Sequence, residues 1–224
     1  IREKWERLLE MPSLDLEDDR YSTFFPATNL QNIGDDVIKY IIPGNLLPTE
    51  DLVEKIKELN PGEAIANGDN KALINCIAKL GTLGDAKPVY RIENDRLPLL
   101  DFFLKINHLN KEALQYDFDI LTKGKVSIAI HPSNGVIAPE NIFIEEGAVV
   151  RHAILNAEDG PIFIAKNALI MEGACLRGPL YIGENATVKM NAAIYGATTV
   201  GPKCVVGGEI KNVVFFGNSN KGHE

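Results

Sequence analysis

Large aliphatic side chains return at every sixth position through the C-terminal part of the chain. Each is followed four places later by a residue that is mostly small, so two positions of a set kind recur in every six. A period of six belongs neither to an α-helix, which repeats about every 3.6 residues, nor to a strand, which alternates about every two. The large set is Ile164, Ile170, Leu176, Ile182, Val188, Ile194, Val200 and Val206; its companions are Ala168, Ala174, Leu180, Ala186, Ala192, Thr198, Cys204 and Ile210.

This periodicity predicts a parallel β-helix, in which three six-residue segments make one triangular coil of about 18 residues. Each large side chain then points inward and stacks on the residue one coil further along, while the small companion fits near a corner. A β-sandwich is the alternative, but it predicts an alternation of two with turns of irregular length. The period carries no information on the hand of the helix.

An earlier block repeats the same period before an interruption. Its large positions are Ala138, Ile144 and Val150, and its companions are Ile142, Ala148 and Ile154. The stretch LNAEDGP at residues 155–161 then shifts the phase. We therefore expect the β-helix to occupy residues 131–224, with one irregular connection inside it.

Residues before about 125 alternate between helical and strand-like patterns, which predicts an α/β part. Helices are expected at residues 1–10, where Trp5, Leu8 and Leu9 share one face, and at 49–59, where Thr49 can cap the first turn. Further helical stretches are residues 97–107 and 110–124.

Strands are expected on both sides of a turn at Asn67-Gly68, within residues 62–78, and again at residues 87–93. Together these elements predict a partial α/β domain at residues 1–130, followed by the β-helix domain at 131–224.

Composition and charge narrow the possible partners. The net charge of −8 disfavours contact with nucleic acid or an anionic membrane surface. Three widely spaced cysteines, Cys76, Cys175 and Cys204, form neither a disulfide framework nor a CxxC metal site, which indicates a reducing, cytoplasmic compartment. No apolar run is long enough for a membrane span. Because the chain begins with Ile1 rather than Met, we expect it to start inside a longer protein.

The repeat from Asp159 to His223 resembles the β-helix of bacterial enzymes that join a nucleotidyltransferase domain to an acetyltransferase-like β-helix. The stretches IREKW, GNLLP and RLPLLDFFLKIN fit the same group, UDP-N-acetylglucosamine diphosphorylase/glucosamine-1-phosphate N-acetyltransferases and proteins described as glucose-1-phosphate thymidylyltransferases. The resemblance implies a left-handed β-helix, a homotrimer and two activities. One transfers a nucleotidyl group to a sugar 1-phosphate with Mg²⁺, and the other transfers acetyl from acetyl-CoA to glucosamine 1-phosphate.

The chain departs from this group at both ends. The G-x-G-T-R loop, whose backbone N–H groups and arginine hold a triphosphate, does not occur in the sequence. Relatives also continue past NKGH with more hexapeptides that complete the acetyl-CoA groove. We therefore expect the N-terminal part to be a truncated nucleotidyltransferase-like domain, the β-helix to be incomplete, and this fragment to be inactive.

The resemblance supplies the candidate site residues. His223 matches the catalytic base of a K-x-G-H stretch, since an imidazole of near-neutral pKa can accept the proton of an attacking amine. Lys211 matches a lysine that holds the sugar phosphate, and Lys221 is a second phosphate candidate. The arginine that partners this lysine in relatives is missing from the stretch AAIYGATT. A solvated corner lysine and a chain-end histidine remain the alternatives.

Other chemistry-bearing residues favour structural roles. Asp101 and Asp117 suit capping or surface positions, and Cys204 suits a core position. The remaining histidines, His108, His131 and His152, do not pair along the β-helix as a zinc hydratase requires, so no metal is expected there. Two functions stay open: an enzyme that makes nucleotide sugars such as UDP-N-acetylglucosamine or dTDP-glucose, and a β-helix that only trimerises the protein or binds a sugar nucleotide as a regulator.

Overall fold

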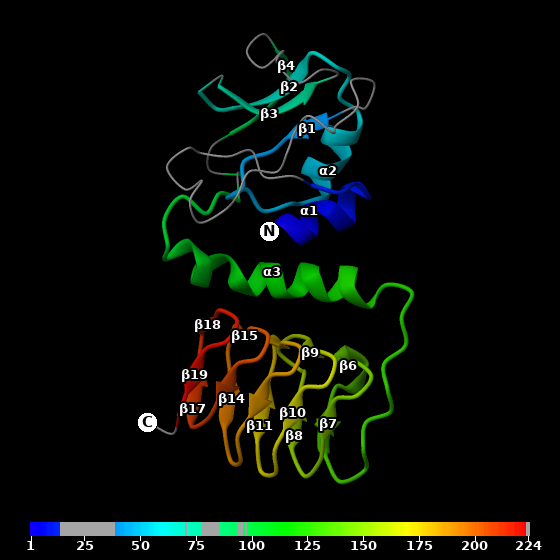
Figure 1. The fold of residues 1–224 in the computed structure, drawn as a ribbon, viewed down its shortest axis with the longest axis vertical. Coiled ribbons are helices and arrows are strands. Elements are labelled where there is room, and N and C mark those ends of the chain that lie inside the picture. Colours follow the sequence, from blue (N-terminus) through cyan, green and yellow to red (C-terminus); the bar gives the residue numbers. More distant parts are fainter. Residues whose placement is uncertain (14–38, 70, 78–85, 94–95, 97, 223–224) are drawn as a thin grey trace. The chain divides into compact units, whose positions relative to one another are not determined.

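The computed structural model describes residues 1–13, 39–69, 71–77, 86–93, 96 and 98–222 (Figure 1). The chain forms two compact units, Ile1–Asp101 and Phe102–Glu224, which are described separately. This division follows packing within the chain. The domain ranges 1–130 and 131–224 that the sequence suggests stay a prediction.

The first unit contains a four-stranded sheet in the order β1-β3-β2-β4. Strand β3 runs antiparallel to both of its neighbours, and β4 runs parallel to β2. The hairpin around Asn67-Gly68 and the strand at 87–93 are therefore confirmed. The strands are β1 (Lys39–Ile41), β2 (Glu63–Asn67), β3 (Ala72–Ile77) and β4 (Lys87–Ile92).

Two short helices complete the described part of this unit, α1 (Arg2–Leu9) and α2 (Glu50–Lys57). Thr49 caps α2, as the sequence predicts: its hydroxyl oxygen accepts a hydrogen bond from the Leu52 backbone N–H at 3.3 Å. Trp5 is buried on α1 and donates its indole N–H to the Leu46 carbonyl at 2.9 Å, which joins α1 to the chain before α2. The helical prediction for residues 97–107 is wrong over its first part, because Leu99 bridges to Leu46 and the next helix begins only at Lys105.

The second unit is a parallel β-solenoid of about five turns, built from three five-stranded sheets. We name each sheet by its first strand. The β5 sheet contains β5 (Gly135–Ile137), β8 (Ile154–Asn156), β11 (Cys175–Arg177), β14 (Ala193–Tyr195) and β17 (Glu209–Lys211). The β6 sheet contains β6 (Ile142–Ile144), β9 (Ile162–Ile164), β12 (Leu180–Ile182), β15 (Thr198–Val200) and β18 (Val214–Phe215). The β7 sheet contains β7 (Val149–Val150), β10 (Leu169–Ile170), β13 (Thr187–Val188), β16 (Val205–Val206) and β19 (Asn220–Lys221).

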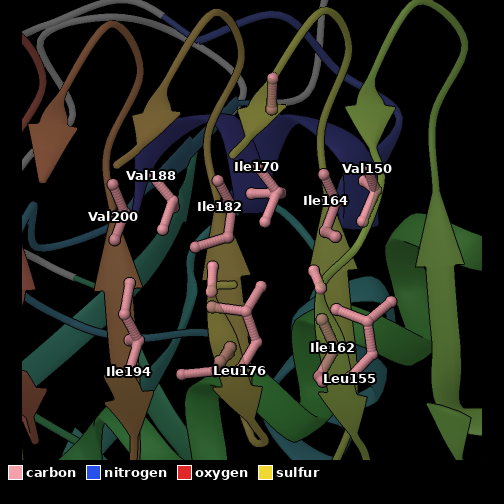
Figure 2. Close-up of a cluster of buried hydrophobic side chains, with 14 of the residues drawn as sticks. Val150, Leu155, Ile162, Ile164, Ile170, Leu176, Ile182, Val188, Ile194 and Val200 are labelled. Carbon is pink, nitrogen blue, oxygen red and sulfur yellow. The ribbon is translucent and has the colours of Figure 1, made fainter. Parts of the chain in front are cut away.

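The predicted columns of aliphatic side chains fill the interior of the solenoid. All sixteen residues of the large and companion sets are buried, and none exposes more than 3% of its surface. In the central coils each residue pairs with the one 18 places further on, for example Ile182 with Val200 and Val188 with Val206. Figure 2 shows side chains from successive strands pointing into the same space. The period of six therefore corresponds to stacked coils.

The first coils are longer than the pattern suggests. Val150 pairs with Ile170 and Leu155 with Leu176, so these turns take 20 and 21 residues instead of 18. The stretch at residues 155–161 supplies the extra length, as predicted. The companion role of Ile154 is wrong: Leu155 faces the core and Ile154 is 50% exposed. Likewise Val136, rather than Ala138, occupies the column beneath Leu155.

The last coil is shorter. Ile210 pairs with Ile194 after 16 residues, and Lys221 pairs with Val206 after 15. Ile210 thus joins the column of large residues instead of the companion set to which its spacing assigned it. The reason is the turn at Gly207-Gly208, which leads from one strand to the next in fewer residues. The same shortening brings Lys221 into register with a column of aliphatic residues.

Helix α3 (Lys105–Thr122) covers the outer side of the β6 sheet. Beneath it the rings of Phe143, Phe163 and Tyr181 form a ladder with centroids 5.3 and 5.6 Å apart. Phe118 and Leu121 of α3 pack on this ladder. The helix predicted for residues 110–124 is therefore present, and it belongs to the solenoid unit by its packing (Figure 1).

Candidate functional site

Lys211 ends strand β17 on the outer side of the β5 sheet, where its side chain is exposed. Its ammonium nitrogen lies 5.5 Å from the centroid of the Tyr195 ring, within the range of a cation–π contact. Tyr195 pairs with Lys211 in the strand ladder, so the contact follows from the register of β14 and β17. The stretch AAIYGATT thus supplies an aromatic neighbour where relatives were expected to supply an arginine.

Glu209 completes this outward cluster. The Tyr195 hydroxyl donates a hydrogen bond to the Glu209 carboxylate, which lies two residues before Lys211 on the same strand. This bond raises the pKa of Tyr195 above its usual value, because it stabilises the protonated phenol beside a negative charge. The cluster therefore holds one cation and one anion on opposite sides of a neutral ring.

Lys221 lies in strand β19, in register with Val206. Its side chain is half-buried, and its ammonium donates a hydrogen bond to the Gly207 carbonyl oxygen at 2.9 Å. A lysine at the end of an aliphatic column can cover the core with its stem while its ammonium reaches a polar atom. Phosphate binding by Lys221 would have to share or replace this bond.

The structure places the two lysines at opposite ends of one side of the last coil. Lys221 contacts Gly207, and Lys211 follows four residues later, a span of about 13 Å for extended chain. Their ammonium groups have different partners and do not converge on one point. His223 lies outside the described residues, so its role as a base stays a prediction, and so do the phosphate roles of both lysines.

The remaining sequence candidates have the following surroundings. Cys204 is fully buried, as predicted, and its sulfur accepts a hydrogen bond from the Ser219 N–H at 3.4 Å. His131 is exposed, and its Nδ1 lies 2.8 Å from the Ser133 hydroxyl. Within the described ranges, no three His, Cys, Asp or Glu side chains gather closely enough to hold a metal ion.

Sequence reasoning missed a second charged group on the same sheet. Arg177, at the end of β11, pairs with Asp159 at 2.6 Å, and Glu158 lies 3.9 Å from its guanidinium. Arg177 precedes Tyr195 by one coil on the same outward side. Stepping by 18 from Arg177 finds Tyr195, but the step from Tyr195 to Lys211 is 16, so an unbroken period hides the relationship.

Comparison with known families addresses the other half of the chain. A family model described as sugar nucleotidyl transferase matches residues 1–126, more than half of the protein. The chain belongs to this sugar nucleotidyl transferase family. The general resemblance seen in the sequence is therefore confirmed, although its narrower assignment to UDP-N-acetylglucosamine enzymes is not tested. Among curated proteins, none matches the chain.

The family match extends through α3, which packs on the solenoid. The last helix of the family segment is therefore also a wall of the neighbouring solenoid. No helix in the described part of the chain combines the length and the apolar character that a bilayer crossing needs.

Proposed function

We propose that this protein acts in nucleotide-sugar synthesis, in the cytoplasm. The reaction transfers a nucleotidyl group from a nucleoside triphosphate to a sugar 1-phosphate and releases pyrophosphate. Products would be nucleotide sugars such as UDP-N-acetylglucosamine or dTDP-glucose. The observation that carries this proposal is the match of residues 1–126 to sugar nucleotidyl transferases.

For the solenoid we propose an acetyltransferase-like role on a left-handed hexapeptide β-helix that assembles as a homotrimer. His223 would accept the proton of the sugar amine, and Lys211 and Lys221 would bind the sugar phosphate. Acetyl-CoA would supply the acetyl group. The columns of stacked aliphatic residues support the hexapeptide architecture, and Lys211 supports an anion contact because its ammonium is exposed.

The two implied co-reactants fit the described residues unequally. Mg²⁺ prefers several oxygen ligands, and the described residues offer no cluster of carboxylates for it, so we derive no step through this ion. Acetyl-CoA carries phosphates, which lysines of the last coil could bind. The described residues give no site for its acetyl group.

The second candidate is a solenoid that trimerises the protein or binds a sugar nucleotide without catalysis. Its support is that Lys221 already donates to a backbone carbonyl and that the cluster of Tyr195, Glu209 and Lys211 is balanced in charge. A site built for a phosphate dianion would instead carry an excess of positive charge.

Two assays separate these functions. The chain, and the complete product of its gene, would be incubated with pyrophosphate, Mg²⁺ and either UDP-N-acetylglucosamine or dTDP-glucose, and nucleoside triphosphate would be measured. Formation of triphosphate by the gene product supports nucleotidyl transfer, and its absence with both nucleotide sugars contradicts it. Release of free thiol from acetyl-CoA with glucosamine 1-phosphate tests acetyl transfer.

Site-directed variants make the second assay specific. Lys211→Met should raise the KM for glucosamine 1-phosphate, whereas Lys166→Met removes the same charge from an exposed corner of the solenoid and should not. Pyrophosphorolysis without any thiol release favours the non-catalytic solenoid. A mass in solution of three times the 24.6 kDa chain would support the trimer, and a monomer would contradict it.

A further inference from the structure

Lys189 follows strand β13 in the β7 sheet, one coil before Gly207. Its backbone N–H donates to the Val206 carbonyl at 2.8 Å, which fixes its position beneath the last coil. A Cβ placed on Gly207 would lie 3.2 Å from both Cβ and Cδ of Lys189, and 3.2 Å from the Gly222 carbonyl oxygen. The lysine stem therefore runs across the space that a side chain at position 207 would fill.

Lys221 reaches the same residue from the other side. Its ammonium nitrogen lies 2.9 Å from the Gly207 carbonyl oxygen. Because both lysines touch Gly207, Cδ of Lys189 and the ammonium nitrogen of Lys221 are no more than about 9 Å apart. The Lys189 ammonium lies two bonds beyond Cδ on a flexible stem, so both ammonium groups can reach one phosphate group.

The surroundings leave this pair with excess positive charge. In the strand ladder, the positions beside Lys189 are Met171 and Gly207, and Lys221 pairs with Val206. The nearest following carboxylate, Glu209, is bonded to the Tyr195 hydroxyl. Among the described residues, no ion pair includes Lys189 or Lys221. Two ammonium groups at this separation repel each other unless an anion lies between them.

We propose that Lys189 and Lys221 together form a binding site for a phosphate group at the Gly207 corner of the last coil. The identity of the ligand rests on the proposed function, because both a sugar 1-phosphate and coenzyme A carry phosphate. Lys189 is the new element of the site: it adds a second charge to Lys221, and Gly207 provides the room for it. The Lys211 cluster, about 13 Å away along the coil and balanced in charge, is separate.

Binding would be measured by calorimetry on the intact chain at low salt, with inorganic phosphate, glucosamine 1-phosphate and coenzyme A as separate probes. Lys189→Met should weaken binding of the preferred probe about tenfold, while Lys189→Arg should retain most of it. Lys166→Met is the matched control for charge and should bind like the unaltered protein. Thermal unfolding of each variant checks that the solenoid is intact.

A glycine pair tests the geometry without removing charge. Gly207→Ala should displace the Lys189 stem and weaken binding, because its new methyl group lies 3.2 Å from that stem. Gly135→Ala places its methyl group 3.6 Å from Ile154, an ordinary contact, and should bind normally.

The outcomes distinguish the two ligand sources and the two proposals. Tighter binding of glucosamine 1-phosphate assigns the site to the sugar phosphate, and tighter binding of coenzyme A assigns it to the acetyl donor. Equal affinity of the Lys189→Met and unaltered proteins, or no binding of any probe, overturns the site. If binding depends on Lys189 but neither enzymatic assay shows turnover, the site stands and the proposed function fails. If turnover occurs with the same KM in Lys189→Met, the site fails alone.

Discussion

Asn110 on α3 and Thr199 on β15 are joined by a hydrogen bond of 2.9 Å, although 89 residues separate them in the chain. The side chain of Asn110 also donates to the Ala197 carbonyl at 2.8 Å, so one buried amide holds the helix to two positions of the solenoid. The contact fixes α3 along its sheet at one end, while Phe118 and Leu121 pack on the aromatic ladder towards the other.

Replacing Asn110 should destabilise the solenoid. Asn110→Ala removes both bonds and leaves polar groups without partners, which costs about 1–3 kcal/mol. Asn107→Ala on the same helix is the control, since Asn107 is exposed and the change in helix propensity is the same. Urea unfolding would be followed by far-ultraviolet circular dichroism, because the only tryptophan lies in the first unit and its fluorescence reports that unit alone. Equal shifts for both variants would contradict the role of Asn110.

The stacked columns should dominate the stability of the solenoid. Ile182 is fully buried between Ile164 and Val200, so Ile182→Ala should lower the free energy of unfolding by about 2–5 kcal/mol through lost burial and a residual cavity. Ile154→Ala is the matched control, because half of the Ile154 surface is exposed and its loss should cost no more than about 0.5 kcal/mol. The same urea titration compares them. A larger effect at Ile154 would mean that the column register is wrong.

The corners depend on close packing between successive coils. Gly147 has φ +80°, and a Cβ on it would lie 2.1 Å from the Asn167 side-chain oxygen. Gly124 has a similar φ of +72° but open space around it. Alanine at either position bears the strain of the left-handed conformation, about 1–2 kcal/mol. Gly147→Ala should therefore be the more destabilising of the two in a thermal melt, and equal melting temperatures would rule out the steric contribution.

The bond between Tyr195 and Glu209 should be visible in a pH titration. It raises the pKa of Tyr195 above its usual value of about 10, so the stabilisation it provides is fully present below that pH and is lost as the pH rises through the raised pKa. Glu209→Gln should bring the Tyr195 pKa back towards its usual value, as measured by tyrosinate absorbance. Tyr195→Phe assigns the signal, which matters because the pKa of Tyr90 is raised in the same way by Glu58. An unchanged titration in Glu209→Gln would contradict the bond.

Most of the elements in the described chain could be predicted from local sequence. The period of six identified every buried residue from Ile164 to Val206, because each coil there contains three equal segments. Thr49 and the turn at Asn67-Gly68 likewise act on residues only a few places away, so their effect is readable from sequence. The candidate lysines rested on resemblance, and neither Tyr195 nor Lys189 could be named as a neighbour from spacing alone.

The sequence by itself determined that aliphatic side chains would stack in coils, because hydrophobic burial at a regular spacing has few other solutions. Only the tertiary structure decided where that spacing changes. A column partner is chosen by hydrogen bonds to the coil beneath, 15 to 21 residues away, and corners of unequal length alter that distance. For this reason Ile154 faces outward, Ile210 joins the main column, and Lys221 ends beside Gly207, where Lys189 also reaches.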